Sequence, residues 1–216
     1  MDDNYRGAIF DFDGTLIDSM QLWDEIGVLY LESKGMPVPP GLNDALKSLT
    51  VEETARYFRV HCGVTDPDEK IYRDINGLAE EHYKDHIPLK PHVRPFLEKL
   101  WNRGVKMAIA TANDHHLTGL ALQRLEIGEF FQGVVTCSDV GVGKEDPAVF
   151  LKALELLGTD LEDTLLFEDA FHAIRTAKGA GFRVVGIYDP AFHAEMEEIR
   201  SLADHYLLSY EAWAYE

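Results

Sequence analysis

Hydrophobic residues recur with two different periods along this chain of 216 residues. The short apolar run Gly7–Phe10 ends abruptly at Asp11, which predicts a buried strand that carries polar residues at its carboxyl end. Beyond it, apolar residues return every three or four positions, which indicates helices. We expect three helices before residue 88: one after Asp18 through Leu22, Ile26, Leu29 and Tyr30, one that opens with a capping box at Thr50 and Glu53, and one through Ile71, Ile75, Leu78 and His82.

The remainder of the chain alternates between strand and helix patterns. We expect strands at 105–110, 134–135, 164–167, 183–187 and 206–208, alternating with helices over 93–103, 114–125, 147–157, 170–180 and 194–202. This alternation predicts an α/β fold with a doubly wound, mainly parallel, Rossmann-like sheet. The three helices expected before residue 88 then form an all-helical cap inserted into the sheet domain. Residues 1–15 and 88–216 would form the core, and residues 16–87 the cap.

Chemically active side chains follow the predicted strands at the points where they end. Asp11 and Asp13 follow the first strand, Thr111 and Asn113 the second, Lys144 lies after the third, and Glu168 and Asp169 follow the fourth. Ligands of a doubly wound sheet bind at the carboxyl ends of its strands, so we expect these groups on one rim. Crowded carboxylates repel one another unless a cation joins them, and their hard oxygen atoms favour Mg²⁺. A lysine can neutralise a transferred phosphoryl group, and a threonine hydroxyl can hold one of its oxygens.

The four segments that hold these residues resemble the motifs of the haloacid dehalogenase superfamily. Asp11-Phe-Asp-Gly-Thr-Leu is similar to its first motif, Ala110-Thr-Ala-Asn-Asp to its second, Gly143-Lys-Glu-Asp-Pro to its third, and Phe167-Glu-Asp-Ala to its fourth. The resemblance covers the whole chain, including a helical cap after the first motif. It is strongest to the group that holds β-phosphoglucomutase and many small-molecule phosphatases. Two motifs depart from the usual pattern: Glu145 stands in place of a proline, and Ala170 and Ala173 in place of a serine and a glycine.

The resemblance implies a role for each residue of the rim. Asp11 would attack phosphorus and form an aspartyl-phosphate, and Asp13 would protonate the leaving oxygen and then activate water. The other implied roles are phosphoryl binding by Thr111 and Lys144, a lining role for Asn113, and Mg²⁺ binding by Asp11, the carbonyl of Asp13, and Asp169, with Glu168 in or near the metal shell.

Some neighbouring residues have two interpretations. Trp23 lies on the first cap helix, where an aromatic side chain either packs in the interior or contacts the substrate, and we include it among the candidate substrate-binding residues. We expect Ser19 to cap that helix and Asp114 to cap the helix after the second strand. His172 is expected near the rim as a helix residue rather than a catalytic base.

Together these residues predict a Mg²⁺-dependent phosphatase that cleaves a small-molecule phosphomonoester, such as a sugar phosphate. A phosphomutase of the β-phosphoglucomutase type is the alternative, in which a sugar hydroxyl accepts the phosphoryl group instead of water. Such mutases share a Gly-x-Ser-Arg-type cap segment, and residues 47–51 here contain neither glycine nor arginine, which favours hydrolysis. A catalytically silent module that binds phosphate or a partner protein is a distant alternative, because every group assigned to the chemistry is present.

Composition limits the partners of the protein. Its 38 acidic and 20 basic residues give a formal charge of −18, which disfavours nucleic acid and anionic lipid as partners. The first six residues hold no apolar stretch, and no apolar run approaches the ~18 residues of a membrane span. Two distant cysteines, Cys62 and Cys137, fit buried thiols in a reducing cytoplasm. We therefore expect a cytoplasmic monomer without a signal peptide.

Overall fold

The computed structural model describes residues 5–47 and 49–215. Some predictions fall on residues outside these ranges. One is the expectation that the first residues are no signal peptide, which includes residues 1–4. The others concern Ser48, within the segment 47–51 compared with the mutases, and the outermost residues of the predicted core.

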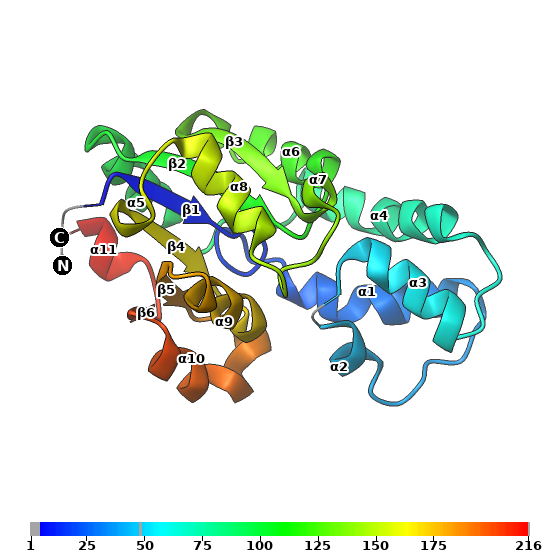
Figure 1. Cartoon of the computed structure of the whole chain (residues 1–216). Helices are drawn as coiled ribbons and strands as arrows, with labels where there is room; N and C mark the ends of the chain where they lie inside the picture. The colour runs from blue at the N-terminus through cyan, green and yellow to red at the C-terminus, as the bar shows by residue number, and fades with distance from the viewer. Residues whose placement is uncertain (1–4, 48, 216) are drawn as a thin grey trace.

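A parallel sheet lies at the centre of the fold (Figure 1). Within the described residues it has six strands: β1 (Gly7–Phe10), β2 (Lys106–Thr111), β3 (Phe131–Thr136), β4 (Thr164–Glu168), β5 (Arg183–Ile187) and β6 (His205–Leu207). Their order is β3-β2-β1-β4-β5-β6, and each neighbouring pair is parallel. The chain therefore changes direction across the sheet between β1 and β4, which makes the end of β1 the switch point where ligands bind. The predicted doubly wound α/β fold is confirmed.

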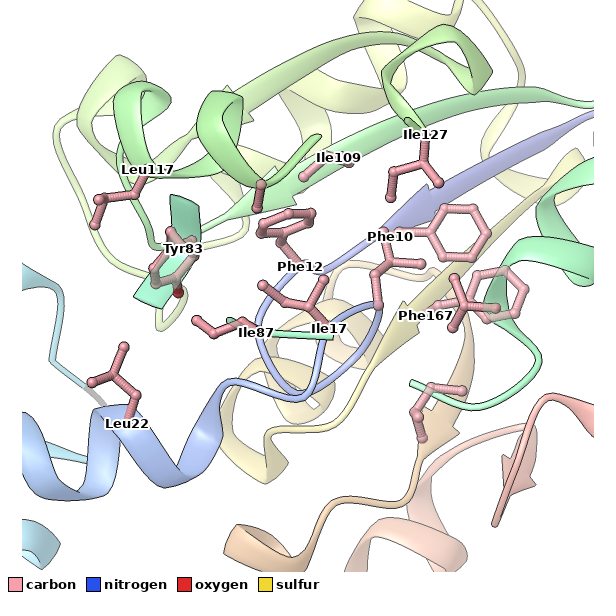
Figure 2. Close-up of a cluster of buried hydrophobic side chains, with 14 of the residues drawn as sticks. Phe10, Phe12, Ile17, Leu22, Tyr83, Ile87, Ile109, Leu117, Ile127 and Phe167 are labelled. Atoms are coloured by element: carbon pink, nitrogen blue, oxygen red, sulfur yellow. The ribbon is translucent and has the colours of Figure 1, made fainter. Parts of the chain in front are cut away.

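Helices cover both faces of this sheet (Figure 1). One face carries α5 (Val93–Asn102), α6 (His115–Arg124) and α11 (Glu211–Tyr215), and the other carries α8 (Ala148–Leu157), α9 (Phe171–Gly179) and α10 (Met196–Leu202). Side chains of β1 alternate between the two layers: Phe10 stacks on Phe167 in the first layer, with ring centres 4.4 Å apart, whereas Ile9 is buried in the second. Figure 2 shows buried hydrophobic side chains of the first layer, including Phe10 and Phe12.

Of the five helices that the described residues form between β1 and β2, four gather beyond the carboxyl ends of the strands (Figure 1). They are α1 (Met20–Ser33), α2 (Leu42–Leu46), α3 (Val51–His61) and α4 (Asp68–Asp85), and we call these four the cap helices, or the cap. The two segments that connect them to the sheet lie side by side, because Asp18 N donates to Pro88 O (3.0 Å) and Lys90 N donates to Leu16 O (2.9 Å). The division into a core and a cap at residues 16 and 87 stays a prediction. None of the helices in the described residues is long and apolar enough to cross a membrane.

Short elements account for most differences from the sequence prediction. The structure adds α2, α7 (Cys137–Val140), α11 and three 3₁₀ turns: η1 (Gly128–Phe130), η2 (Leu161–Asp163) and η3 (Pro190–Glu195). An apolar repeat cannot reveal elements this short, because they span fewer than two helical turns. The capping box of Thr50 and Glu53 is confirmed at the start of α3.

The buried stripe of α4 differs from the predicted one. Ile71 and Ile75 are buried as predicted, but Leu78 is 37% exposed and His82 is also exposed. The stripe continues instead through Ala79 and Tyr83, each four residues further on. Spacings of three and four residues both fit a helix, so the period alone does not determine which of the two sets of residues faces the interior. On α1, Leu29 is likewise exposed rather than buried.

Candidate active site

A cavity of about 150 Å³ lies where the carboxyl ends of the strands face the cap helices. Every residue predicted for the site lines it: Asp11, Asp13, Trp23, Thr111, Asn113, Lys144, Glu168 and Asp169. The parallel register explains this convergence, because Phe10 pairs with Ile109 of β2 and with Phe167 of β4. The residues that follow these three strands therefore emerge at the same edge of the sheet.

Asp11 and Lys144 form an ion pair inside the protein. Lys144 Nζ donates to Asp11 Oδ1 and also to Glu168 Oε2, the latter at 2.7 Å. Burial and the charge of Glu168 raise the pKa of Asp11 to about 6, although Lys144 opposes this shift. Burial alone would lower the pKa of Lys144, but the charges of Asp11 and Glu168 raise it well above its ordinary value. The lysine is therefore a permanent cation beside two carboxylates.

Asp169 leaves one carboxylate oxygen without a protein partner. Its Oδ1 accepts a hydrogen bond from Thr15 at 2.9 Å, whereas Oδ2 is buried and has no hydrogen-bond partner among the described residues. Burial and the charges of Glu168 and Asp11 raise the pKa of Asp169 well above its ordinary value. One oxygen each of Asp11, Glu168 and Asp169 lies within 4.8 Å of the others. A hard cation such as Mg²⁺ would satisfy the orphaned oxygen and relieve the repulsion.

Glu168 differs from its neighbours because both of its oxygens have protein donors. Oε2 accepts from Lys144, and Oε1 accepts from the backbone N–H groups of Asp169 and Ala170, both at 3.1 Å. These bonds fix the Glu168 side chain beside the acidic cluster. Because both oxygens are occupied, Glu168 fits the role of a residue that orients the cluster better than the role of a direct metal ligand.

Gly14 and Lys90 shape the loop that carries Asp11 and Asp13. Gly14 has a φ of +81°, and a Cβ at this position would clash with Asp169 Oδ2, so only glycine fits here. Lys90 Nζ donates to the carbonyl oxygen of Gly14 and, at 2.8 Å, to that of Tyr188. The connector after the cap thus holds the turn next to the catalytic candidates.

The carboxylate of Asp13 is surrounded by donors. Its Oδ1 accepts hydrogen bonds from Ser19 (2.6 Å), Trp23 Nε1 (3.2 Å) and the hydroxyl of Tyr83, and its Oδ2 accepts from Asn113 Nδ2 (3.0 Å). Burial and the charge of Asp11 raise the pKa of Asp13, and several of these hydrogen bonds oppose the shift. Burial and the charge of Asp13 also raise the pKa of Tyr83, so the phenol keeps its proton and acts as the donor.

The two capping predictions around the rim have different outcomes. The capping role expected of Ser19 is wrong, because its side chain makes no capping bond and donates to Asp13 instead. Asp114 caps α6 as predicted. Its second oxygen also accepts from Tyr72 (2.8 Å) and Asn76 (2.7 Å) of α4, which attaches a cap helix to the core.

The departures from the family motifs leave the charged groups in place. Ala170 lines the cavity, and Ala173 is fully buried in the layer beneath α9. Glu145 is exposed next to Lys144. His172 lines the cavity near these residues, and burial lowers its pKa.

The cap side of the cavity is mostly apolar. Its lining consists of Met20, Trp23, Asp24, Ile26, Asn43, Leu46, Lys47, Leu49, Thr50, Val51, Thr54 and Ile75. Lys47 reaches across to the core, where its ammonium donates to Glu195 at 2.9 Å and lies 4.4 Å from the ring centre of Phe192. Among the described residues that line the cavity, only Lys47, Lys144 and His172 can carry positive charge.

A doubly wound sheet with buried carboxylates and one lysine at its switch point defines a class of hydrolases, and comparisons with known proteins identify the family. The chain matches the haloacid dehalogenase-like hydrolases over residues 8–187 and belongs to that family. It is 28% identical over 183 residues to the phosphorylated carbohydrates phosphatase of Thermotoga maritima, covering 84% of this chain and 85% of the relative. It is 29% identical over 192 residues to the phosphoglycolate phosphatase of Pseudomonas putida, covering 84% and 69%.

Among solved structures, CbbY from Rhodobacter sphaeroides in complex with phosphate has the same fold. The TM-score is 0.84 at 22% sequence identity, and the match covers 95% of each chain. The predicted superfamily and the predicted phosphatase class of enzyme are confirmed by the family match and by the two phosphatase relatives.

Proposed function

We propose that the protein is a Mg²⁺-dependent phosphatase that hydrolyses a small-molecule phosphomonoester through an aspartyl-phosphate on Asp11. The observation that carries the proposal is the buried cluster of Asp11, Glu168 and Asp169 beside Lys144, in which Asp169 Oδ2 has no hydrogen-bond partner in the described part of the chain. Burying several carboxylates so close together costs folding free energy, and such clusters occur at functional sites. Here the cluster would bind a cation that in turn attracts an anionic substrate.

The metal would be held by Asp11, the backbone carbonyl of Asp13, and Asp169. Glu168 would orient this set, since Lys144 and two backbone N–H groups already occupy its oxygens. When bound, Mg²⁺ would offset the charge of the carboxylates and of the phosphate, so that an anionic nucleophile can approach an anionic substrate.

The protein groups supply the remaining chemistry. A carboxylate oxygen of Asp11 attacks phosphorus while the bond from phosphorus to the leaving oxygen breaks, and Asp13 gives that oxygen a proton. Water then attacks the phosphoryl group and gives its proton to Asp13, and cleavage of the bond to Asp11 releases inorganic phosphate. Lys144 and Thr111 hold the phosphoryl oxygens during both steps.

The cavity favours a compact monophosphate. Its volume of about 150 Å³ is of the order of a cavity that holds one benzene molecule. Both lysines that line it are paired with carboxylates, Lys47 with Glu195 and Lys144 with Asp11 and Glu168. Burial lowers the pKa of His172, which disfavours its charged form, so a second phosphate group would lack a free cationic partner among the described lining residues. This argument favours water over a phosphosugar as the acceptor, and hydrolysis over the mutase reaction.

The direct test is phosphate release from p-nitrophenyl phosphate and a panel of small phosphomonoesters, with Mg²⁺ and with EDTA. Wild type should turn over only with Mg²⁺, and Asp11→Asn should lose activity at least about 1,000-fold because it removes the nucleophile. Asp44→Asn, the same chemical change at an exposed position of α2, is the matched control and should keep full activity. Turnover that persists in EDTA or in Asp11→Asn would contradict the proposal.

A further inference from the structure

Three polar atoms form a closed triangle between the cap and the loop after β1. The hydroxyl of Tyr83 donates to Asp13 Oδ1. Trp23 Nε1 lies 3.2 Å from the same oxygen and 2.7 Å from the Tyr83 hydroxyl. The two rings meet edge to face, with centres 6.1 Å apart and planes 62° apart. Because Trp23 belongs to α1 and Tyr83 to α4, the triangle joins both cap helices to one carboxylate.

Tyr83 does not itself line the cavity. Its side chain is fully buried, and the cavity wall includes its partners Asp13 and Trp23 but not Tyr83. Figure 2 shows its ring beside Leu117 and Ile87, where α4 meets the core. Tyr83 can therefore influence a bound substrate only through the residues that it contacts.

The core holds Tyr83 in place. Arg124 of α6 donates from Nε to the carbonyl oxygen of Tyr83 at 3.0 Å and from a second nitrogen to the carbonyl oxygen of Ile87. Earlier in α4, the side chains of Tyr72 and Asn76 donate to Asp114, at the start of α6. These bonds attach α4 to α6, so the phenol hydroxyl has a fixed place relative to the sheet.

We propose that Tyr83, together with Trp23, is a positioning residue that fixes the orientation of the Asp13 carboxyl group for proton transfer to the leaving alcohol. The inference rests on the proposed role of Asp13. Donors from Tyr83, Trp23 and Ser19 occupy Oδ1 and prevent the carboxyl group from rotating. Oδ2 accepts only from Asn113 among the described residues, and it is the oxygen left to exchange a proton.

The leaving group provides a readout that a purely structural role would not change. p-Nitrophenolate is a weak base and leaves without a proton, whereas an alkoxide leaves only when an acid protonates it. In Tyr83→Phe, kcat/KM for propyl phosphate should fall about 10- to 100-fold, the size expected when a proton donor is misplaced. The value for p-nitrophenyl phosphate should fall less than about 3-fold. The quantity to measure is the ratio of the two kcat/KM values, because kcat/KM includes departure of the leaving group.

Tyr30→Phe is the matched control. Tyr30 is also a fully buried cap tyrosine, and its hydroxyl has no hydrogen-bond partner among the described residues, so this variant should keep the wild-type ratio. Trp23→Phe is the second variant and should shift the ratio in the same direction as Tyr83→Phe. A double-mutant cycle with Asp13→Asn completes the test. On that background Tyr83→Phe should cause no further selective loss, because it acts through Asp13.

The outcomes separate this inference from the proposed function. Equal losses on both esters in Tyr83→Phe, or no loss on either, would overturn the positioning role while Asp13→Asn still showed a selective loss on propyl phosphate. If Asp13→Asn itself left the ratio unchanged, the acid role of Asp13 would fail, and the positioning role with it.

Discussion

Lys90 Nζ lies 2.8 Å from Asp189 Oδ2, and this buried ion pair joins the connector after the cap to the loop after β5. The side chains are 12% and 1% exposed. The same ammonium also donates to the carbonyl oxygen of Gly14, directly after Asp13. Lys90, in the connector after the cap, thus binds both the loop that follows β1 and the loop that follows β5.

Removal of this lysine should destabilise the protein strongly. Lys90→Met leaves Asp189 buried without its cation, and we expect the free energy of unfolding to fall by about 3–5 kcal/mol. Urea unfolding at pH 7 measures this difference. Lys178→Met breaks an ion pair of similar length with Asp204 near the surface and should cost at most about 1 kcal/mol. Similar losses in both variants would contradict the structural role of Lys90.

Replacement of Asp169 should have opposite effects with and without metal. The buried Oδ2 of Asp169 has no hydrogen-bond partner within residues 5–47 and 49–215, and in EDTA this carboxylate repels Asp11 and Glu168. Asp169→Asn should therefore be at least as stable as wild type in EDTA. With Mg²⁺ at about 100 times its dissociation constant, wild type should gain about 2.7 kcal/mol, and the variant much less. Thermal unfolding with EDTA and with MgCl₂ measures both values. An equal Mg²⁺ response in the two proteins would remove Asp169 from the metal site.

The sequence was sufficient to predict the groups at the strand ends. The residues after β1, β2 and β4 could be assigned to one rim because parallel strands end at the same edge, and the register between Phe10, Ile109 and Phe167 has this consequence. The existence of the long helices could be predicted from apolar repeats that extend over several turns. The short helices α2 and α7 could not, because they have too few residues to show a period.

The surroundings of Asp13 could not be predicted in this way. Tyr83 follows Asp13 by 70 residues, and its contact depends on how α4 packs against α6. The helical period of α4 permits a stripe through Leu78 and His82 as readily as one through Ala79 and Tyr83. Only tertiary packing decides between them, because it determines which side of the helix meets the core.

The protein should lose stability at alkaline pH through Cys137. Burial raises the pKa of this thiol to about 12, well above the value near 8.5 expected in the unfolded chain. As the pH rises above about 8.5 the unfolded chain loses its proton first, so the free energy of unfolding should fall by about 1.4 kcal/mol per pH unit. By pH 10 the loss should be about 2 kcal/mol.

Comparison of cysteine variants isolates this contribution. Cys137→Ala should show a weaker decline in the free energy of unfolding between pH 8 and pH 10 than wild type, measured by urea unfolding under reducing conditions. Cys62 is only partly buried, contrary to the prediction of two buried thiols, and Cys62→Ala should change the decline much less. Parallel pH profiles of wild type and Cys137→Ala would show that the thiol does not contribute.

The apolar cap should select against hydroxylated substrates. Propyl phosphate and glycerol 1-phosphate share a three-carbon skeleton and similar leaving groups, but glycerol phosphate must bury two hydroxyl groups. Thr50 already accepts a backbone hydrogen bond, and Lys47 pairs with Glu195, so these two cap residues offer such hydroxyls little. Since an unpaired buried hydroxyl costs about 1–3 kcal/mol, kcat/KM should favour propyl phosphate about 10-fold or more.

Leu49 provides the test of this selection, since it lines the cavity from the cap. In Leu49→Asn a polar side chain can bond a substrate hydroxyl, so the ratio of the two kcat/KM values should move toward one. Leu151→Asn makes the same chemical change at a 45% exposed position on α8 and should leave the ratio unchanged. A wild-type enzyme that prefers glycerol 1-phosphate would show that other polar lining groups, such as Asn43 or Thr54, bind the hydroxyls, and that the apolar side chains serve packing.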